Sequence, residues 1–187
     1  YIVIMLLASL WCTQTIEAAD AIIAYNGDTV PTASNNETLK IRIWNSTNGG
    51  SLGNEVELGD TGATIRQVVV KNSPYRQKTI AVTQGFDGNL TGFVCTSNCG
   101  SAGSWTMSPA IGNNSVWLGA TGAQRRFDIA FETATGDALI VFTIVNTSVT
   151  CDLAAVILPD SSNSFVGIDP YCINSEMNET ANPSYTW

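Results

Sequence analysis

The chain has 187 residues, of which 44% are hydrophobic and 13% charged, and its formal net charge is −8. The apolar share is typical of a folded protein and the charge content is about half of the usual ~25%, which excludes disorder driven by charge. So acidic a chain repels phosphate backbones, which argues against nucleic-acid binding. The absence of histidine excludes Ser-His-Asp triads, Cys-His dyads and histidine-ligated zinc or haem.

Residues 1–11 form an apolar segment, and no charged side chain precedes Glu17. This run is shorter than the ~20 residues that span a bilayer. One interpretation is a retained segment that buries itself against other copies of the protein. The other is the apolar centre of a signal peptide that lacks a basic region and is cleaved near Ala19-Asp20-Ala21. We expect retention, with these residues in the assembly contact: Tyr1, Ile2, Val3, Ile4, Met5, Leu6, Leu7, Leu10 and Trp11.

The composition of this segment favours a helix from Tyr1 to about Tyr25 over a strand. Leucine and alanine are good helix formers, and Asn26-Gly27-Asp28 supplies a stop signal. The β alternative rests on the β-prone start, Tyr1 to Ile4, which could act as a donor strand that completes a sheet of a neighbouring subunit. The expected division is therefore an assembly segment, 1–25, and a β-domain, 26–187.

The rest of the chain consists of short apolar runs separated by Gly, Asn, Asp and Ser. Period-two alternation predicts strands, and a series of short strands predicts a mainly β protein, an Ig-like antiparallel β-sandwich. Residues 138–145 are too apolar for a half-exposed strand and indicate a central one. The predicted strands are 39–43, 65–70, 79–83, 126–132, 138–145 and 153–158.

The run over 126–132 shows the clearest alternation. Phe127, Ile129 and Phe131 are predicted to face the core, whereas the charged residues of the run, Arg126 among them, are predicted to face water. Glycine-containing pairs predict tight turns, and the Gly/Ser-rich stretch 101–114 is predicted to be a surface loop. The turn candidates are Asn48-Gly49-Gly50, Asp87-Gly88 and Gly136-Asp137.

Ser, Thr and Asn supply the polarity that charge does not, with 53 of 187 residues. They create six Asn-x-Ser/Thr sequons, which are possible N-glycan acceptors in an exported protein. A chain this rich in the three residue types also forms sequons by chance. The candidate acceptors are Asn36, Asn45, Asn89, Asn113, Asn146 and Asn178.

Five cysteines are present, and Cys12 belongs to the apolar segment. The other four allow two disulfides in three connectivities, or they stay as free buried thiols. The most local pairing is Cys95 with Cys99 and Cys151 with Cys172. Oxidised pairs would place the protein outside the cell, and the lack of a Cys-x-x-Cys pair argues against zinc.

Candidates for chemistry are few. Glu55, Glu57 and Asp60 are close in sequence, and they either hold calcium or form a solvated loop face. Asp128 and Glu132 share a strand face with Arg126, which predicts a surface ion pair. A glycosidase needs two carboxylates flanking the scissile bond, and no motif indicates such a pair. Three tryptophans either stack on sugars or cap the core: Trp44, Trp105 and Trp117, the first of them on an outer sheet face.

An apolar N-terminus without a basic region, a polar break, and a Ser/Thr/Asn-rich β-domain with sequons together resemble a mature type IV pilin-like subunit. The archaeal pilins and flagellins are the nearer branch, since Met5 stands where bacterial type IV pilins carry a glutamate. The resemblance implies a helix buried in a filament core and a glycosylated β outer wall.

We therefore expect a non-enzymatic subunit of an extracellular pilus or filament at the cell surface. It would polymerise with identical copies, need no metal or cofactor, and meet a membrane only before assembly. The alternative is a secreted or surface-anchored carbohydrate-binding β-sandwich with a truncated signal peptide. A secreted hydrolase using two carboxylates is a third class.

Overall fold

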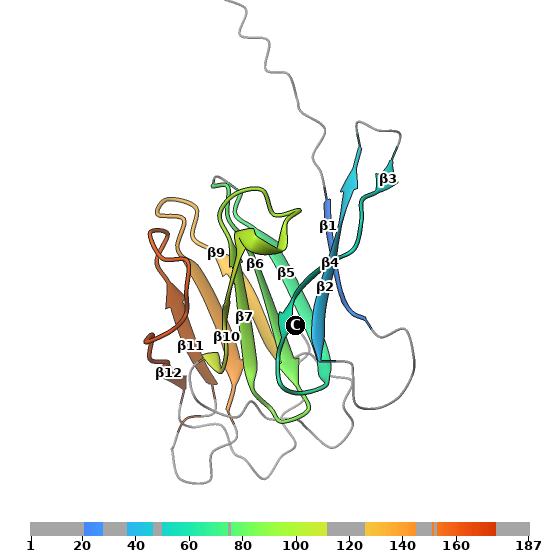
Figure 1. Ribbon diagram of the computed structural model, residues 1–187. Coiled ribbons are helices and arrows are strands. Elements are labelled where there is room, and N and C mark those ends of the chain that lie inside the picture. Colours follow the sequence, from blue (N-terminus) through green and yellow to red (C-terminus); the bar gives the residue numbers. More distant parts are fainter. Residues whose placement is uncertain are drawn as a thin grey trace, which may run out of the picture.

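The computed structural model describes residues 21–27, 37–46, 50–74, 76–111, 126–144, 151 and 153–174. These residues form three four-stranded antiparallel sheets (Figure 1). Sheet A contains β1 (Ala21–Asn26), β2 (Thr38–Asn45), β3 (Ser51–Leu52) and β4 (Val56–Asp60). Sheet B contains β5 (Ile65–Asn72), β6 (Thr79–Gly85), β7 (Leu90–Cys95) and β8 (Trp105–Ser108), the last preceded by a 3-10 turn, η1 (Ala102–Ser104). Sheet C contains β9 (Phe127–Phe131), β10 (Ala138–Thr143), β11 (Leu153–Leu158) and β12 (Tyr171–Asn174).

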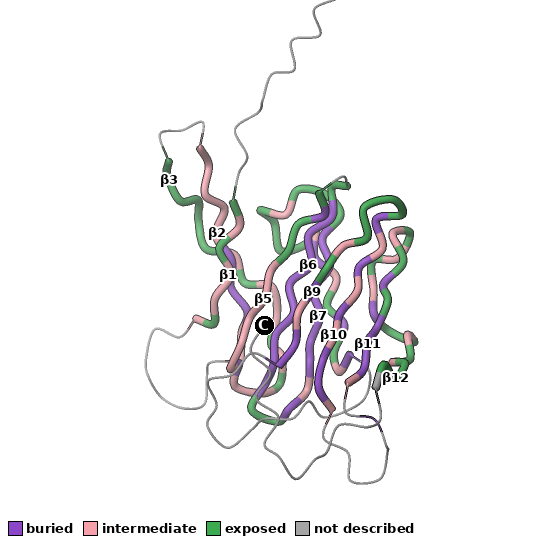
Figure 2. The backbone as a smooth tube through the Cα atoms, turned by 180° about the vertical axis from the view of Figure 1, so that it is seen from behind, coloured by how far each residue is buried: buried purple, intermediate pink, exposed green. Residues whose placement is uncertain are grey.

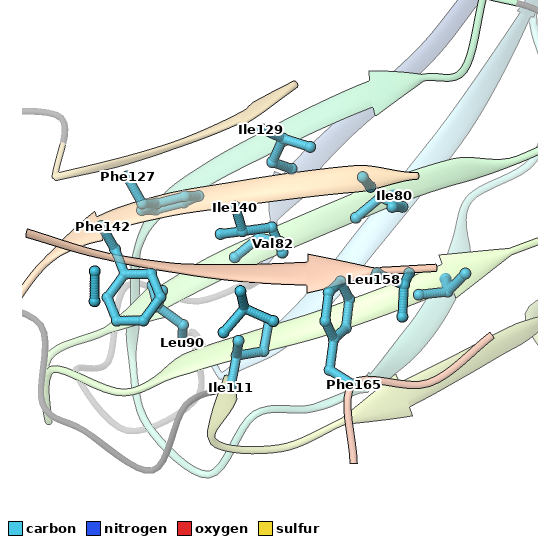
Figure 3. Packing of buried hydrophobic residues seen from close by; sticks show 14 of the residues in the cluster. Ile80, Val82, Leu90, Ile111, Phe127, Ile129, Ile140, Phe142, Leu158 and Phe165 are labelled. Atoms are coloured by element: carbon cyan, nitrogen blue, oxygen red, sulfur yellow. The ribbon is translucent and has the colours of Figure 1, made fainter. Parts of the chain in front are cut away.

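The sheets stack in the order A, B, C, with one apolar core on each side of sheet B. The core between sheets A and B includes Leu39 and Ile41 of β2 and Phe93 of β7. The core between sheets B and C is larger and gathers aliphatic and phenylalanine side chains from both sheets (Figure 3). Its labelled members are Ile80, Val82, Leu90, Ile111, Phe127, Ile129, Ile140, Phe142, Leu158 and Phe165.

Sheet B is covered on both faces, as the burial colouring of its central strands shows (Figure 2). Every residue of β6 and β7 is buried. Alternation along β6 sends Ile80 and Val82 toward sheet C and Ala81 toward sheet A. A mainly β, antiparallel protein is thus confirmed, with one more layer than the two sheets of a sandwich.

The sequence predicts the strand positions well where alternation is clean. Each of the six predicted runs overlaps a strand, and β10 pairs with a neighbour on both sides, as its apolar composition indicates. Two of the predicted turns connect strands, and both have a glycine in the left-handed region, Gly88 and Gly136, each with φ of 84°. The Asn48-Gly49 turn lies outside the described residues.

The prediction of helix as far as Tyr25 is wrong for its last five residues. Residues 21–26 form strand β1, which pairs antiparallel with β2, and Ile22 and Ala24 pack into the core between sheets A and B. Sheet pairing and burial of a β-branched face outweigh local helix propensity here. Residues 21–25 therefore belong to the β-structure of sheet A. Residues 1–20 lie outside the described residues.

Two further predictions are corrected. Within the predicted loop 101–114, β8 forms an edge strand of sheet B, and its first residue, Trp105, is a core residue with 8% of its surface exposed. Arg126 does not face water, since it is 3% exposed. It precedes β9 where this strand lies against β5, and its backbone N–H donates to Gln67 Oε1 at 3.3 Å. Burial, with a contribution from nearby Arg66, lowers the pKa of the Arg126 guanidinium.

Candidate functional site

The three-layer stack has two outward sheet faces, and the one on sheet C is apolar. Register places Leu139 opposite Ala130 and Ile157, and Val141 opposite Asp128. The residues between them on each strand point into the core between sheets B and C. By alternation, Leu139, Val141 and the residues opposite them therefore point outward. We call the outward apolar residues the sheet C face: Ala130, Leu139, Val141, Leu153, Ile157, Tyr171 and Ile173.

The sheet C face is partly open to solvent, and Ala155, which lies between Val141 and Tyr171 in the register, is fully buried on it. Ile157, Tyr171 and Ile173 are 44%, 45% and 48% exposed. The charged residues of this face lie along the edge strand β9: Asp128, whose Oδ1 accepts a hydrogen bond from the backbone N–H of Ile129 at 2.7 Å, and Arg126 and Glu132, which flank the strand on the same side by alternation. Contiguous apolar surface of this kind marks an interaction site in soluble proteins.

The outward face of sheet A carries a charged network instead. Lys40 Nζ lies 2.8 Å from Glu55 Oε1 and 3.2 Å from Glu57 Oε1, and the Tyr25 hydroxyl donates to Glu55 Oε2 at 2.6 Å. The hydrogen bonds to Glu55 and then Glu57 raise the pKa of Lys40, and those from Lys40 and then Tyr25 lower the pKa of Glu55. The network gathers Lys40, Glu55 and Glu57 on this face.

The carboxylates near residue 55 are therefore occupied by Lys40 rather than arranged around a metal. Glu55 and Glu57 share one face, as predicted, but Asp60 Oδ1 accepts from the backbone N–H of Gly62 at 2.8 Å. No group of three metal-ligating side chains occurs in the described parts of the chain.

Glu132 holds the turn that follows β9. Its carboxylate accepts hydrogen bonds from the backbone N–H groups of Ala134 and Thr135 in the β9–β10 connection. These bonds lower the pKa of Glu132.

Of the three tryptophans, one is in the core and one is on a surface. Trp105 is buried, and its indole N–H donates to the carbonyl of Cys99 at 2.9 Å, so it caps the core between sheets A and B. Trp44 pairs with Ala21 in β1 and Leu52 in β3, on the outward face of sheet A, as predicted. Trp117 lies outside the described residues.

The disulfides have the most local of the three connectivities. Cys95 pairs with Cys99, four residues on, and Cys151 pairs with Cys172, 21 residues on. The second bond ties β12 to the chain that enters β11. It thereby fixes the strand that presents Tyr171 and Ile173 on the sheet C face. Two disulfides are compatible with an oxidising environment.

Two of the six sequons fall in the described structure. Asn45 ends β2, and Asn89 lies in the β6–β7 turn, where its Nδ2 donates to Asp87 Oδ2 at 2.7 Å. The two residues that follow Asn89 in its sequon, Leu90 and Thr91, are buried in β7. The other acceptors lie outside the described residues: Asn36, Asn113, Asn146 and Asn178.

A pocket of about 430 Å³ lies between the β5–β6 hairpin and the Cys95–Cys99 loop. The described residues that line it carry hydroxyl, amide and cationic groups and no carboxylate. Its buried Lys78 turns its ammonium to the carbonyls of Pro159 and Asp160, at 3.2 and 2.6 Å, where it ties sheet B to the loop after β11. The lining therefore does not supply the two carboxylates of a hydrolase.

Comparison with protein-family models, with curated proteins and with solved structures finds no match to this chain. Within the described residues, no helix has the length and apolarity required to cross a membrane. The assembly residues Tyr1 to Trp11 lie outside the described part of the chain.

Proposed function

We propose that the protein is a non-enzymatic structural subunit of an extracellular filament or pilus. One observation carries the proposal: an uncharged apolar segment, Tyr1 to Trp11, joins a disulfide-bonded β-domain that itself exposes an apolar sheet face. Both features need a protein partner, and identical copies supply one for each. The subunits would form a homopolymer whose outer surface is rich in Ser, Thr and Asn and carries N-glycans.

The energetics of the segment support polymerisation. It is too short to span a bilayer and too apolar to remain in water, so other protein must cover it. Its nine large apolar side chains would contribute on the order of 20 kcal/mol on burial, at about 1.5–3 kcal/mol each and before ordering costs. A net binding free energy well below this figure is enough to stabilise a polymer.

In this proposal residues 1–20 are mainly helical and the β-domain is Ig-like, in line with the resemblance to archaeal pilin-like subunits. Cell-surface localisation is supported by the two disulfides.

The proposal is tested by placing one charge inside or just outside the apolar run of the full-length chain. Leu7→Lys should abolish filaments, as seen by electron microscopy and sedimentation, because a buried unpaired ammonium is strongly unfavourable. Thr13→Lys adds the same charge beyond the run and should leave filaments intact. Equal polymerisation of the two variants, or a native chain that stays monomeric at all concentrations, would refute the proposal.

Carbohydrate binding is the second candidate, because Trp44 and Tyr25 both lie on the outward face of sheet A. An aromatic platform of this kind stacks on sugars. This function predicts that Trp44→Ala lowers glycan affinity and leaves the sedimentation of the protein unchanged.

A further inference from the structure

The two apolar features of the protein are attached to opposite layers. The segment Tyr1 to Trp11 joins the β-domain at Ala21, the first residue of β1 in sheet A. The sheet C face lies on the other outer layer, with sheet B between them (Figures 1 and 2). The apolar segment is therefore connected through residues 12–20 to sheet A, whereas the apolar face belongs to sheet C.

The chemistry of the two outward faces decides which of them suits the segment. An uncharged apolar segment laid on sheet A would desolvate the charges of Lys40, Glu55 and Glu57, which is unfavourable. On the sheet C face it would meet mainly apolar side chains, because the charged residues Arg126, Asp128 and Glu132 lie along β9, at one edge of the sheet. The hydrophobic gain is thus available on sheet C without a comparable electrostatic cost.

The length of the apolar segment also matches the length of the strands in sheet C. Eleven residues in a helix are about 16 Å long at ~1.5 Å per residue. Strands β10 and β11 have six residues each, and six residues of a strand extend about 20 Å at ~3.3 Å per residue. A helix lying on one face of a sheet is a standard way to cover that face.

We propose that Tyr1–Trp11 of one subunit packs on the sheet C face of the next subunit. This inference rests on the proposed filament function and specifies its contact. Because the segment and the face are different parts of the chain, the contact is heterologous. Repeated from copy to copy, it gives an open, polar filament rather than a closed dimer.

A matched pair of isoleucines tests the receiving face. Ile157 on the sheet C face and Ile23 on the outward side of sheet A are 44% and 45% exposed. In the full-length chain, Ile157→Lys should raise the concentration of soluble subunit in equilibrium with filaments about tenfold or more. Ile23→Lys should change it by less than twofold. The thermal unfolding of both unpolymerised variants should match, since both substituted side chains point to solvent.

Cross-linking locates the contact directly and does not depend on how the variants fold. A photoactivatable phenylalanine analogue replaces Leu6 in full-length protein, which is mixed with isotope-labelled copies before assembly. Cross-links from position 6 to labelled peptides containing β10, β11 or β12 would support the proposal. Filaments whose cross-links map to sheet A, to another segment 1–11, or within one chain would overturn this inference and leave the filament function standing. A preparation without filaments would instead refute the proposed function as well.

Discussion

The disulfide between Cys151 and Cys172 should contribute more to stability than the one between Cys95 and Cys99. Both bonds include one cysteine that is at least 95% buried, so replacement of either pair by alanine removes a similar amount of packing. The bonds differ in the length of chain that they close, which is 21 residues for the first and 4 for the second.

Loop-closure entropy sets the expected magnitude. For these two lengths the chain-entropy relation gives about 3.3 and about 1.9 kcal/mol at 25 °C, a difference of about 1.4 kcal/mol. The larger loss should also loosen β12, which presents Tyr171 and Ile173 on the sheet C face.

Urea unfolding of the two double variants, Cys151→Ala with Cys172→Ala and Cys95→Ala with Cys99→Ala, measures these losses. The slope against urea is compared as well, since a change in it would indicate an altered unfolded state. Equal losses for the two pairs, or a larger loss for the short loop, would show that entropy of the unfolded chain is not the main contribution.

Two further predictions concern packing and pH. A Cβ at Gly92 would lie 2.6 Å from Phe165 Cδ2 and 2.7 Å from Ile111 Cδ1, so Gly92→Ala should cost about 1–3 kcal/mol in urea unfolding through overpacking. Gly103→Ala should cost far less, because its Cβ would meet nothing within 4 Å. Similar losses for the two variants would argue against the packing of Phe165 and Ile111 on β7. Because backbone hydrogen bonds lower the pKa of Glu132 from its ordinary 4.5, its contribution to stability is fully present above that value and is lost as the pH falls through the lowered pKa. Glu132→Gln should therefore be less stable than the native chain at pH 6, with the difference shrinking toward pH 3; a difference that is constant with pH would contradict the assignment.

Alternation predicted β9 because its neighbours bury one set of side chains and leave the other nearer to solvent, whereas apolar composition predicted β10 and β11. The same pattern hid β7, where Gly92 interrupts the apolar run Leu90 to Cys95 and both faces are buried. It also hid β8, since a Gly/Ser-rich stretch has no period and Trp105 alone indicates burial there. Weakly patterned strands form where the neighbouring sheets cover them.

The sequence does not predict the third sheet layer, for a related reason. The run Thr79 to Thr83 alternates, so it predicts one buried and one solvent-exposed face. In the structure, however, Ala81 and Thr83 are also buried, on the side of sheet A. Small and weakly polar side chains fit both situations. The burial of Arg126 has a similar cause. Alternation within its own strand would leave this residue exposed, but the edge of a neighbouring sheet buries it.

The sequence predicts only one of the two surfaces in the proposed assembly contact. The segment Tyr1 to Trp11 is evident because eleven uncharged, mostly large side chains occur in a row. The sheet C face is built from Leu139, Val141, Ile157 and their neighbours, which in the sequence indicate only a central strand and an apolar run. Pairing and stacking are needed to show that this set points outward.

Electron microscopy of the native material, with its subunits identified by mass spectrometry, tests the central claim most directly. The account predicts long, uniform filaments whose subunits retain the peptide Tyr1 to Trp11. Monomeric particles that lack residues 1–21 would contradict it, because the apolar segment would then be a removed signal rather than the element that holds the polymer together.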